Sequence, residues 1–328
     1  MRWQLSSLIF FTCLMIVASL HIGLRVYTPE EVWRALVAND GSSEALIISG
    51  LRLPRTLAAL FVGAALGVSG LLMQGVLRNP LAEPGLLGVN AGASFAVVFA
   101  FAVLGVSGFL ALSIYALMGA SAVMAVIFAL VATARGALTP VSLVLAGVTI
   151  AAFVSSLTQV LIVTDEGTME ALLFWLAGGF ADRGGVILWS VGPLLIMGML
   201  VAALFSRELD VMVTGDETSR ALGIDTVRLR LFVFGLSSSL AGLSVVIAGP
   251  VGFIGLVAPH IARLMGGQSH AQLLPRTALC GASIALVADI SARRIVMPQE
   301  VPVTATLALI GAPVLIGLVR TSRLRATA

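Results

Sequence analysis

Ten stretches of apolar residues dominate the sequence, and most are about as long as a membrane-crossing helix. Such a helix needs roughly 20 consecutive apolar residues. The composition agrees, since 59% of the residues are hydrophobic, 11% are charged and the mean hydropathy is +1.08, whereas soluble domains carry about 25% charged residues. We therefore predict an all-α polytopic membrane protein with a single transmembrane domain over residues 1–328. The expected spans are 5–24, 56–76, 89–106, 110–131, 143–163, 186–205, 231–248, 251–265, 278–295 and 304–319.

The distribution of arginine predicts the orientation of these spans. Every basic residue apart from histidine is an arginine, and the chain has no lysine. If both termini are cytoplasmic, the inner segments hold 12 arginines and the outer segments hold 7. Because cytoplasmic loops carry an excess of positive charge, we predict that both termini lie in the cytoplasm. The first apolar run is expected to remain as an uncleaved span.

An internal repeat relates the two halves of the chain. Residues 66–84 and 241–259 align with an offset of 175. The first copy begins in a span predicted to run inward and the second in one predicted to run outward. This is typical of the inverted-topology repeats of transporters, with halves at roughly 52–165 and 228–320. The identities are Gly67, Ser69, Leu81 and Pro84 with Gly242, Ser244, Leu256 and Pro259.

The loop at 206–230 concentrates charge, with nine charged residues among 25. Within it, ETSRALG predicts a short helix. Asp216 and Glu217 stand at its start, where the helix dipole favours acids, and Gly223 is placed to end it. Without a lysine, the chain cannot form a Walker phosphate-binding loop. If transport is driven by ATP, the ATPase must be a separate polypeptide, and this loop would offer it a contact.

Several motifs together make a resemblance specific. They are RLPRTLAALFVGAALGVSGLLMQGVLRNPLAEPGLLGVNAGA (52–93), LVLAGV (143–148), ALGIDTVRLR (221–230), GPVGFIGLVAPHIARL (249–264), LLPRTALCGA (273–282), ADISAR (288–293) and GAPVLIGLV (311–319). Over essentially its whole length, the chain resembles the FecCD-type permeases that import ferric siderophores, haem and vitamin B12 through ATP-binding-cassette (ABC) transporters. The resemblance implies the type II ABC importer permease fold, a location in the bacterial cytoplasmic (inner) membrane and transport without an ATPase site of its own.

The resemblance also implies partners and site residues. The partners are a second permease subunit, identical or homologous, two cytoplasmic ATP-binding subunits that bind ATP-Mg, and an extracytoplasmic substrate-binding protein. Lipid surrounds the spans, and this chain itself is expected to bind no cofactor, metal or nucleic acid. The expected ATPase-coupling residues are Asp216, Glu217, Arg220, Ala221, Leu222 and Gly223; those docking the binding protein are Arg52, Arg55 and Arg293; and those of the cytoplasmic gate are Asn79 and Leu81.

The outer arginines have a second interpretation. Arginine binds carboxylates bidentately, which suits docking onto an acidic partner. It can also end a membrane helix and reach lipid headgroups. Asp289 stands four residues before Arg293 on one expected helix, so we predict that these two side chains form an ion pair.

Other functions fit parts of the sequence. GVSG occurs at 67–70 and 105–108 and resembles the serine motif of rhomboid-type proteases, with His260 as the available base. A secondary transporter driven by protons or sodium would fit the inverted repeat, although such transporters usually carry several ionisable groups within their helices. Ferric siderophore is the expected substrate of an importer, with vitamin B12 and haem as alternatives.

Overall fold

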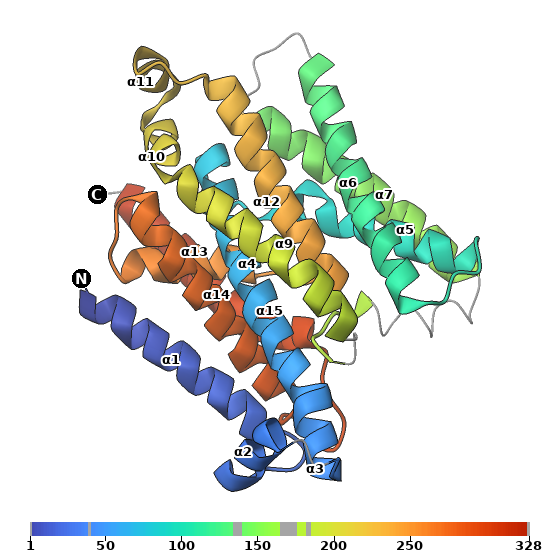
Figure 1. Ribbon diagram of the computed structural model, residues 1–328. Coiled ribbons are helices and arrows are strands. Elements are labelled where there is room, and N and C mark those ends of the chain that lie inside the picture. The colour runs from blue at the N-terminus through green and yellow to red at the C-terminus, as the bar shows by residue number, and fades with distance from the viewer. Residues whose placement is uncertain (1, 39–40, 134–139, 165–175, 182–184, 327–328) are drawn as a thin grey trace.

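The computed structural model describes residues 2–38, 41–133, 140–164, 176–181 and 185–326. All regular elements in these ranges are helices (Figure 1). They are α1 (Arg2–His21), α2 (Pro29–Val37), α3 (Ser43–Ala45), the π-helix η1 (Leu46–Arg52), α4 (Leu53–Leu77), the 3-10 helix η2 (Pro84–Leu87), α5 (Val89–Ala102), α6 (Phe109–Thr133), α7 (Pro140–Thr164), α9 (Gly185–Leu204), α10 (Ser206–Thr214), α11 (Asp216–Ala221), α12 (Thr226–Ala248), α13 (Ile254–Leu264), α14 (His270–Ala292) and α15 (Val303–Ala326).

The predicted spans correspond one by one to helices of the structure. Seven helical stretches in the described residues are long and apolar enough to cross a membrane, and three further apolar helices are shorter. The short ones are Val89–Ala102, Ile254–Leu264 and Val303–Val314. The prediction of an all-α polytopic membrane protein is confirmed.

The second span is longer than the sequence predicted. Helical structure runs without a break through Ser43–Leu77, which is 35 residues and about 52 Å of helix. The hydrocarbon core of a bilayer is about 30 Å thick, so this continuous helix is longer than a crossing requires. The amphipathic helix α2, which the sequence reading did not predict, lies beside α3 and η1. Its capping box joins Thr28 and Glu31, and hydrogen bonds from Thr28 lower the pKa of the Glu31 carboxyl.

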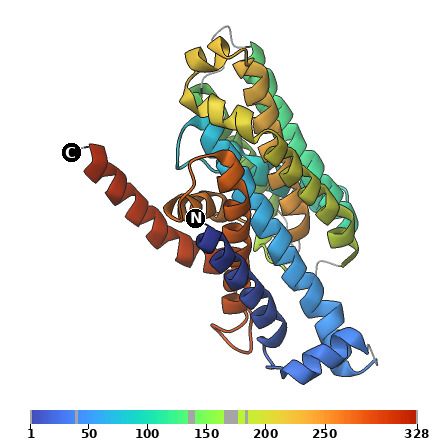
Figure 2. The same ribbon diagram turned by 60° about the vertical axis from the view of Figure 1, so that its left-hand side comes forward.

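Different short helices lie at the two ends of the bundle. Figure 1 shows α2 and α3 at one end, which we call the α2 end, and α10 and α11 at the other, which we call the α11 end. Both chain termini point toward the α11 end. Figure 2 shows α15 diverging from the other helices as it approaches its C-terminal end.

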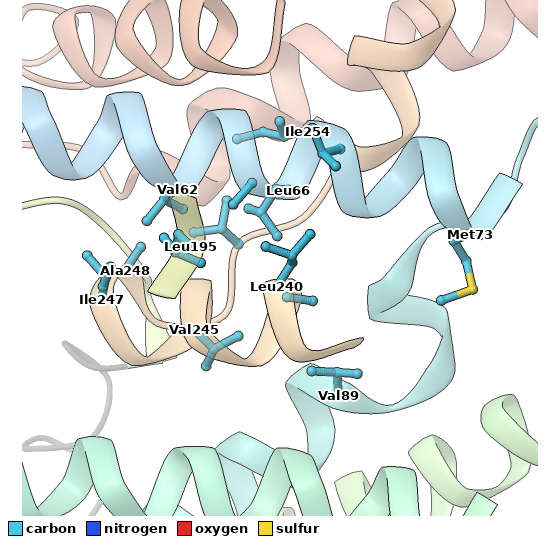
Figure 3. Packing of buried hydrophobic residues seen from close by; sticks show 14 of the residues in the cluster. Val62, Leu66, Met73, Val89, Leu195, Leu240, Val245, Ile247, Ala248 and Ile254 are labelled. Atoms are coloured by element: carbon cyan, nitrogen blue, oxygen red, sulfur yellow. The ribbon is translucent and has the colours of Figure 1, made fainter. Parts of the chain in front are cut away.

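Helix α4 forms the centre of the bundle. In the most hydrophobic 18-residue stretch of the span that contains α4, 83% of the residues are buried, against 11% in the span of α7. Figure 3 shows Val62 and Leu66 of α4 packed near Leu195, Leu240 and Ile254 from three other helices. Small residues let backbones approach closely, as is common in membrane bundles. Added Cβ atoms on Gly63 and Gly67 would meet α14, and one on Gly70 would meet α13.

Helices α4 and α12 run in opposite directions. Helix α4 ends beside α10, because Arg78 donates to the Met212 carbonyl oxygen at 3.0 Å, and α12 begins directly after α11. Ser69 and Ser237 join the two helices by donating hydrogen bonds to each other's backbone carbonyl oxygens. Each helix is followed by a break and a shorter apolar helix, α5 or α13. This arrangement agrees with the predicted inverted repeat.

Candidate functional site

The short helix predicted in the charged loop is α11. It begins at Asp216 and ends at Ala221, and Gly223 follows with a φ of +80°. The Gly223 amide donates to the Arg220 carbonyl oxygen and the Ile224 amide to that of Ser219, which is a glycine-terminated helix end. Exposed residues make up most of this segment, namely Glu217, Thr218, Arg220, Ala221, Leu222 and Gly223. Leu222, 64% exposed, offers an apolar contact among charges.

The predicted gate residues form a tight turn after α4. Arg78 has left-handed backbone angles at the end of α4, and the Asn79 side-chain oxygen accepts a hydrogen bond from the Leu81 amide at 3.0 Å. The side-chain oxygen of Asn79 thereby stabilises the turn. Both Asn79 and Leu81 are exposed, and their place at a cytoplasmic gate stays a prediction.

Glu83 joins the two broken segments of the repeat. Its carboxylate accepts a hydrogen bond from the Phe253 amide at 2.6 Å. Phe253 precedes α13 with a left-handed φ of +70°, so its backbone is strained. Helix α13 has 11 residues and is only about 16 Å long, too short to cross a hydrocarbon core of about 30 Å by itself. Discontinuous helices of this kind form the substrate sites of many transporters.

Replacing Glu83 by leucine is expected to lower the free energy of unfolding by about 1–3 kcal/mol, because the Phe253 amide would lose its acceptor where water is scarce. Glu83→Gln keeps a side-chain oxygen at the same place and should lower it less. Thermal unfolding of the two purified variants in detergent measures the difference. Equal stability of Glu83→Leu and the wild type would contradict a structural role for this bond.

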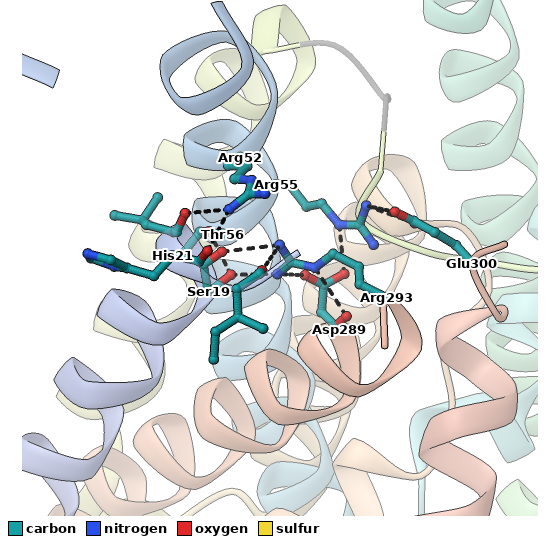
Figure 4. A network of polar contacts seen from close by, with 10 residues as sticks. Ser19, His21, Arg52, Arg55, Thr56, Asp289, Arg293 and Glu300 are labelled. Atoms are coloured by element: carbon teal, nitrogen blue, oxygen red, sulfur yellow. Dashed lines mark hydrogen bonds and ion pairs between the residues drawn. The ribbon is translucent and has the colours of Figure 1, made fainter. Parts of the chain in front are cut away.

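A network of charged groups lies at the α2 end (Figure 4). The Asp289 carboxylate, fully buried, receives Arg293 at 2.6 Å and Arg55 at 2.8 Å. Arg55 also reaches Glu300 at 2.9 Å, and Arg293 donates to the Ser19 hydroxyl at 2.7 Å. The predicted Asp289–Arg293 pair is confirmed. The network ties α1, α4 and α14 to the segment before α15.

The three outer arginines are thus close together, but their guanidinium groups are engaged within the chain. Arg52 is 8% exposed and donates to the Leu20 and Arg25 carbonyl oxygens, and its guanidinium stacks over the Tyr27 ring. Arg293 is 3% exposed. Together with Arg55 they line an open hollow of about 470 Å³. Docking of these arginines onto a partner stays a prediction.

Long-range contacts are what the sequence reading missed. The partners Arg55 and Asp289 are 234 residues apart, and Glu83 and Phe253 are 170 apart. The acidic residue within NPLAEP was a visible signal for Glu83, because a carboxylate at a break between membrane helices needs a hydrogen-bond donor. Among the residues described, no three histidine, cysteine or acidic side chains gather into a group that could hold a metal ion.

Comparisons of fold and sequence show that the protein is a multi-pass permease of the ABC importer type. The profile of the FecCD transport family matches residues 11–321, and the chain belongs to that family. It is a transport subunit, and ATP hydrolysis takes place on separate subunits. The relatives named below are permeases of import or transport systems rather than proteases.

Three relatives illustrate the match. The chain is 41% identical over 284 residues to the Fe(3+)-citrate import system permease protein YfmD of Bacillus subtilis (strain 168), covering 87% of this chain and 84% of that one. It is 41% identical over 311 residues to the ferric enterobactin transport system permease protein FepD of Escherichia coli (strain K12), covering 94% and 92%. A solved structure described as an inward-facing conformation of a metal-chelate type ABC transporter matches with a TM-score of 0.84 at 30% identity, covering 97% and 99%.

Proposed function

We propose that this permease imports a ferric chelate, most simply a ferric siderophore, across the bacterial cytoplasmic membrane by alternating access. Relatives named for ferric citrate and ferric enterobactin support this substrate class. The observation that carries the mechanism is the exposed helix α11, a charged protein contact on a chain that is otherwise apolar. Both termini and the α11 end then lie in the cytoplasm, as the arginine count predicts.

The complex that we propose has a second permease subunit, two cytoplasmic ATP-binding subunits that hold ATP-Mg, and an extracytoplasmic substrate-binding protein. The largely unburied α7 is compatible with a second permease, because such a helix can face another subunit as well as lipid. This chain needs no cofactor of its own in such a scheme. Asn79 and Leu81 would narrow the cytoplasmic mouth of the shared pathway.

The substrate class is tested by uptake into liposomes that contain the purified complex and are supplied with the loaded binding protein. Ferric citrate, ferric enterobactin, haem and vitamin B12 serve as separate probes. We expect saturable uptake of ferric citrate, of ferric enterobactin or of both. Uptake of vitamin B12 or haem with no uptake of either iron chelate would overturn the choice of substrate while leaving the transport class intact.

Gly223→Val tests α11 as the ATPase contact. A residue with a side chain pays about 1–2 kcal/mol in the left-handed region, although an added Cβ would meet no atom within 4 Å. The helix end should therefore change shape without disturbing the bundle. We expect weaker retention of the ATPase in affinity purification, or ATP hydrolysis without uptake. The control is Gly235→Ala in α12, where an added Cβ also meets nothing. Normal substrate-stimulated transport by Gly223→Val would count against the assignment.

Docking of the binding protein is proposed at the α2 end, with Arg52, Arg55 and Arg293 forming the site. Arg55 is the member proposed to meet a partner's carboxylate, because it alone of the three is not fully buried and its partner Glu300 is 37% exposed at the same hollow. Buried Asp289 holds the Arg55 Nε at 2.8 Å and so aims the outer guanidinium nitrogens at the hollow. Arg52 and Arg293 support the surrounding backbone.

Arg55→Gln combined with Glu300→Gln removes this pair without leaving an unpaired carboxylate at the hollow. A hydrogen bond to a charged group contributes about 1.5–3 kcal/mol, so affinity for the binding protein should fall at least about tenfold. Arg34→Gln, an exposed arginine on α2, is the surface control. Surface plasmon resonance on the complex in nanodiscs gives the dissociation constants. Unchanged affinity in a well-folded double variant would leave these arginines with a structural role only.

A further inference from the structure

Asp210 of α10 holds the beginning of α14. One oxygen of its carboxylate, Oδ1, accepts two hydrogen bonds from His270, from the backbone amide at 2.7 Å and from the ring Nδ1 at 2.6 Å. The residue before α14, Ser269, gives no side-chain cap. Because the first amides of a helix lack acceptors within the helix, Asp210 supplies from another element the cap that α14 does not supply for itself.

The His270 ring lies where three helices meet. His270 is 6% exposed, and its Nε2 lies 3.6 Å from where a Cβ would stand on Gly75 of α4. The end of the Met212 side chain, from α10, lies 3.8 Å from the same point. The α14 ring and the end of the α10 side chain thus both lie within van der Waals reach of α4 at Gly75.

Helix α10 is also fixed to α11 and to α4. Ser219 of α11 is fully buried, and its hydroxyl contacts the carbonyl oxygens of Val211 at 2.9 Å and Gly215 at 2.6 Å. Arg78, at the end of α4, donates to the Met212 carbonyl oxygen at 3.0 Å. A displacement of α11 must therefore move α10, and α10 meets α14 through Asp210.

Helix α14 connects this contact with the far end of the molecule. It runs from His270 to Ala292 and carries Asp289, the centre of the network at the α2 end. Along the way its backbone lies against α4, where Gly63 and Gly281 allow close approach. A shift at His270 is thus passed to the outer end by packed helices, which have few ways to deform separately.

We propose that the Asp210–His270 contact is the joint through which movement of α11 reaches α14, with both residues acting as positioning residues for transport. This inference rests on the proposed role of α11 as the ATPase contact. The hydrogen bonds from His270 to Asp210 would transmit a displacement of α11 to α14.

The chemistry of the joint allows a matched pair of variants. Asp210→Ala removes both bonds. Asp210→Asn keeps an acceptor oxygen, and because Oδ1 alone receives both bonds, asparagine can retain the joint without its charge. Thr214→Ala is the control on the same helix, since that hydroxyl is bonded within α10, to the Val211 carbonyl oxygen, and the residue is exposed.

The experiment uses the full complex in liposomes. Leu81→Cys, in a chain whose Cys13 and Cys280 are replaced by alanine, reports the inner mouth through its rate of labelling by a membrane-impermeant maleimide. Rates are compared without nucleotide and with ATP plus orthovanadate. ATP hydrolysis, measured without orthovanadate, and retention of the ATPase on the tagged permease are determined on the same preparations.

With Asp210→Ala, we expect the ATPase to stay bound and to hydrolyse ATP while the nucleotide-dependent change in labelling rate shrinks about tenfold, as the loss of two hydrogen bonds implies. Asp210→Asn and Thr214→Ala should keep that change. The proposed joint would be wrong if Asp210→Ala kept the full nucleotide-dependent change in labelling rate. It would also be wrong if this variant no longer bound the ATPase. Failure of Asp210→Asn to retain the response would overturn the hydrogen-bonded form of the joint.

The proposed role of α11 fails separately. It is wrong if Gly223→Val keeps ATPase binding and the wild-type labelling response. If Gly223→Val uncouples the complex and Asp210→Ala does not, α11 is the contact and the joint lies elsewhere.

Discussion

Replacing Asp289 by alanine should lower the free energy of unfolding by about 3–5 kcal/mol, because removing one partner from a buried ion pair leaves uncompensated charge in the interior. Here two guanidinium groups, those of Arg55 and Arg293, share one fully buried carboxylate. The variant should give little folded protein in the membrane. Thermal unfolding of whatever can be purified in detergent measures the loss.

The control for this prediction is Glu300→Gln in the same network. Its carboxylate is 37% exposed, and exposed ion pairs contribute only about 0–1 kcal/mol. We expect nearly normal stability and yield. If Asp289→Ala were as stable as Glu300→Gln, the network would not be what joins α14 to α4 at the α2 end.

Gly70→Val should prevent α4 and α13 from packing. A Cβ at this position would overlap the backbone of Gly255, including its carbonyl oxygen. No side chain can move aside to relieve that overlap, so the helices must separate, and overpacking of a core costs typically 1–3 kcal/mol and sometimes more. We expect a loss at or above the upper end of this range, seen as a large drop in melting temperature and in uptake.

Gly235→Val is the matched control, since it introduces the same side chain into a helix glycine with no atom within 4 Å of the added Cβ. Its uptake and melting temperature should stay close to those of the wild type. Similar damage from both substitutions would point to helix propensity or membrane insertion rather than to the close approach of α4 and α13.

The sequence was sufficient for the features that depend on local pattern. Hydropathy located ten apolar helices because membrane spans must satisfy their own backbone and present apolar side chains to lipid. Asp216 and Glu217 at the start of the segment and Gly223 at its end located α11, because helix ends have local chemical requirements. The Asp289–Arg293 pair was predictable from its four-residue spacing.

Features that depend on tertiary packing could not be read in the same way. Arg55 meets Asp289, and Glu83 meets the Phe253 amide, only because α4 lies at the centre of the bundle. In the sequence, nothing distinguishes Asp210 from the other acids of the charged loop, whereas in the structure its carboxylate is hydrogen-bonded to His270. The helical extension over 43–52 was missed because it lies outside the apolar stretch 56–76 from which the second span was predicted.

The most direct test of the account is the energy source of uptake. The complex, with its ATPase subunits facing the lumen, is placed in liposomes with or without internal ATP and with or without an imposed proton or sodium gradient. Loaded binding protein is added outside. The account predicts uptake of the iron chelate that requires internal ATP and survives an uncoupler. Uptake driven by an ion gradient without ATP would contradict it.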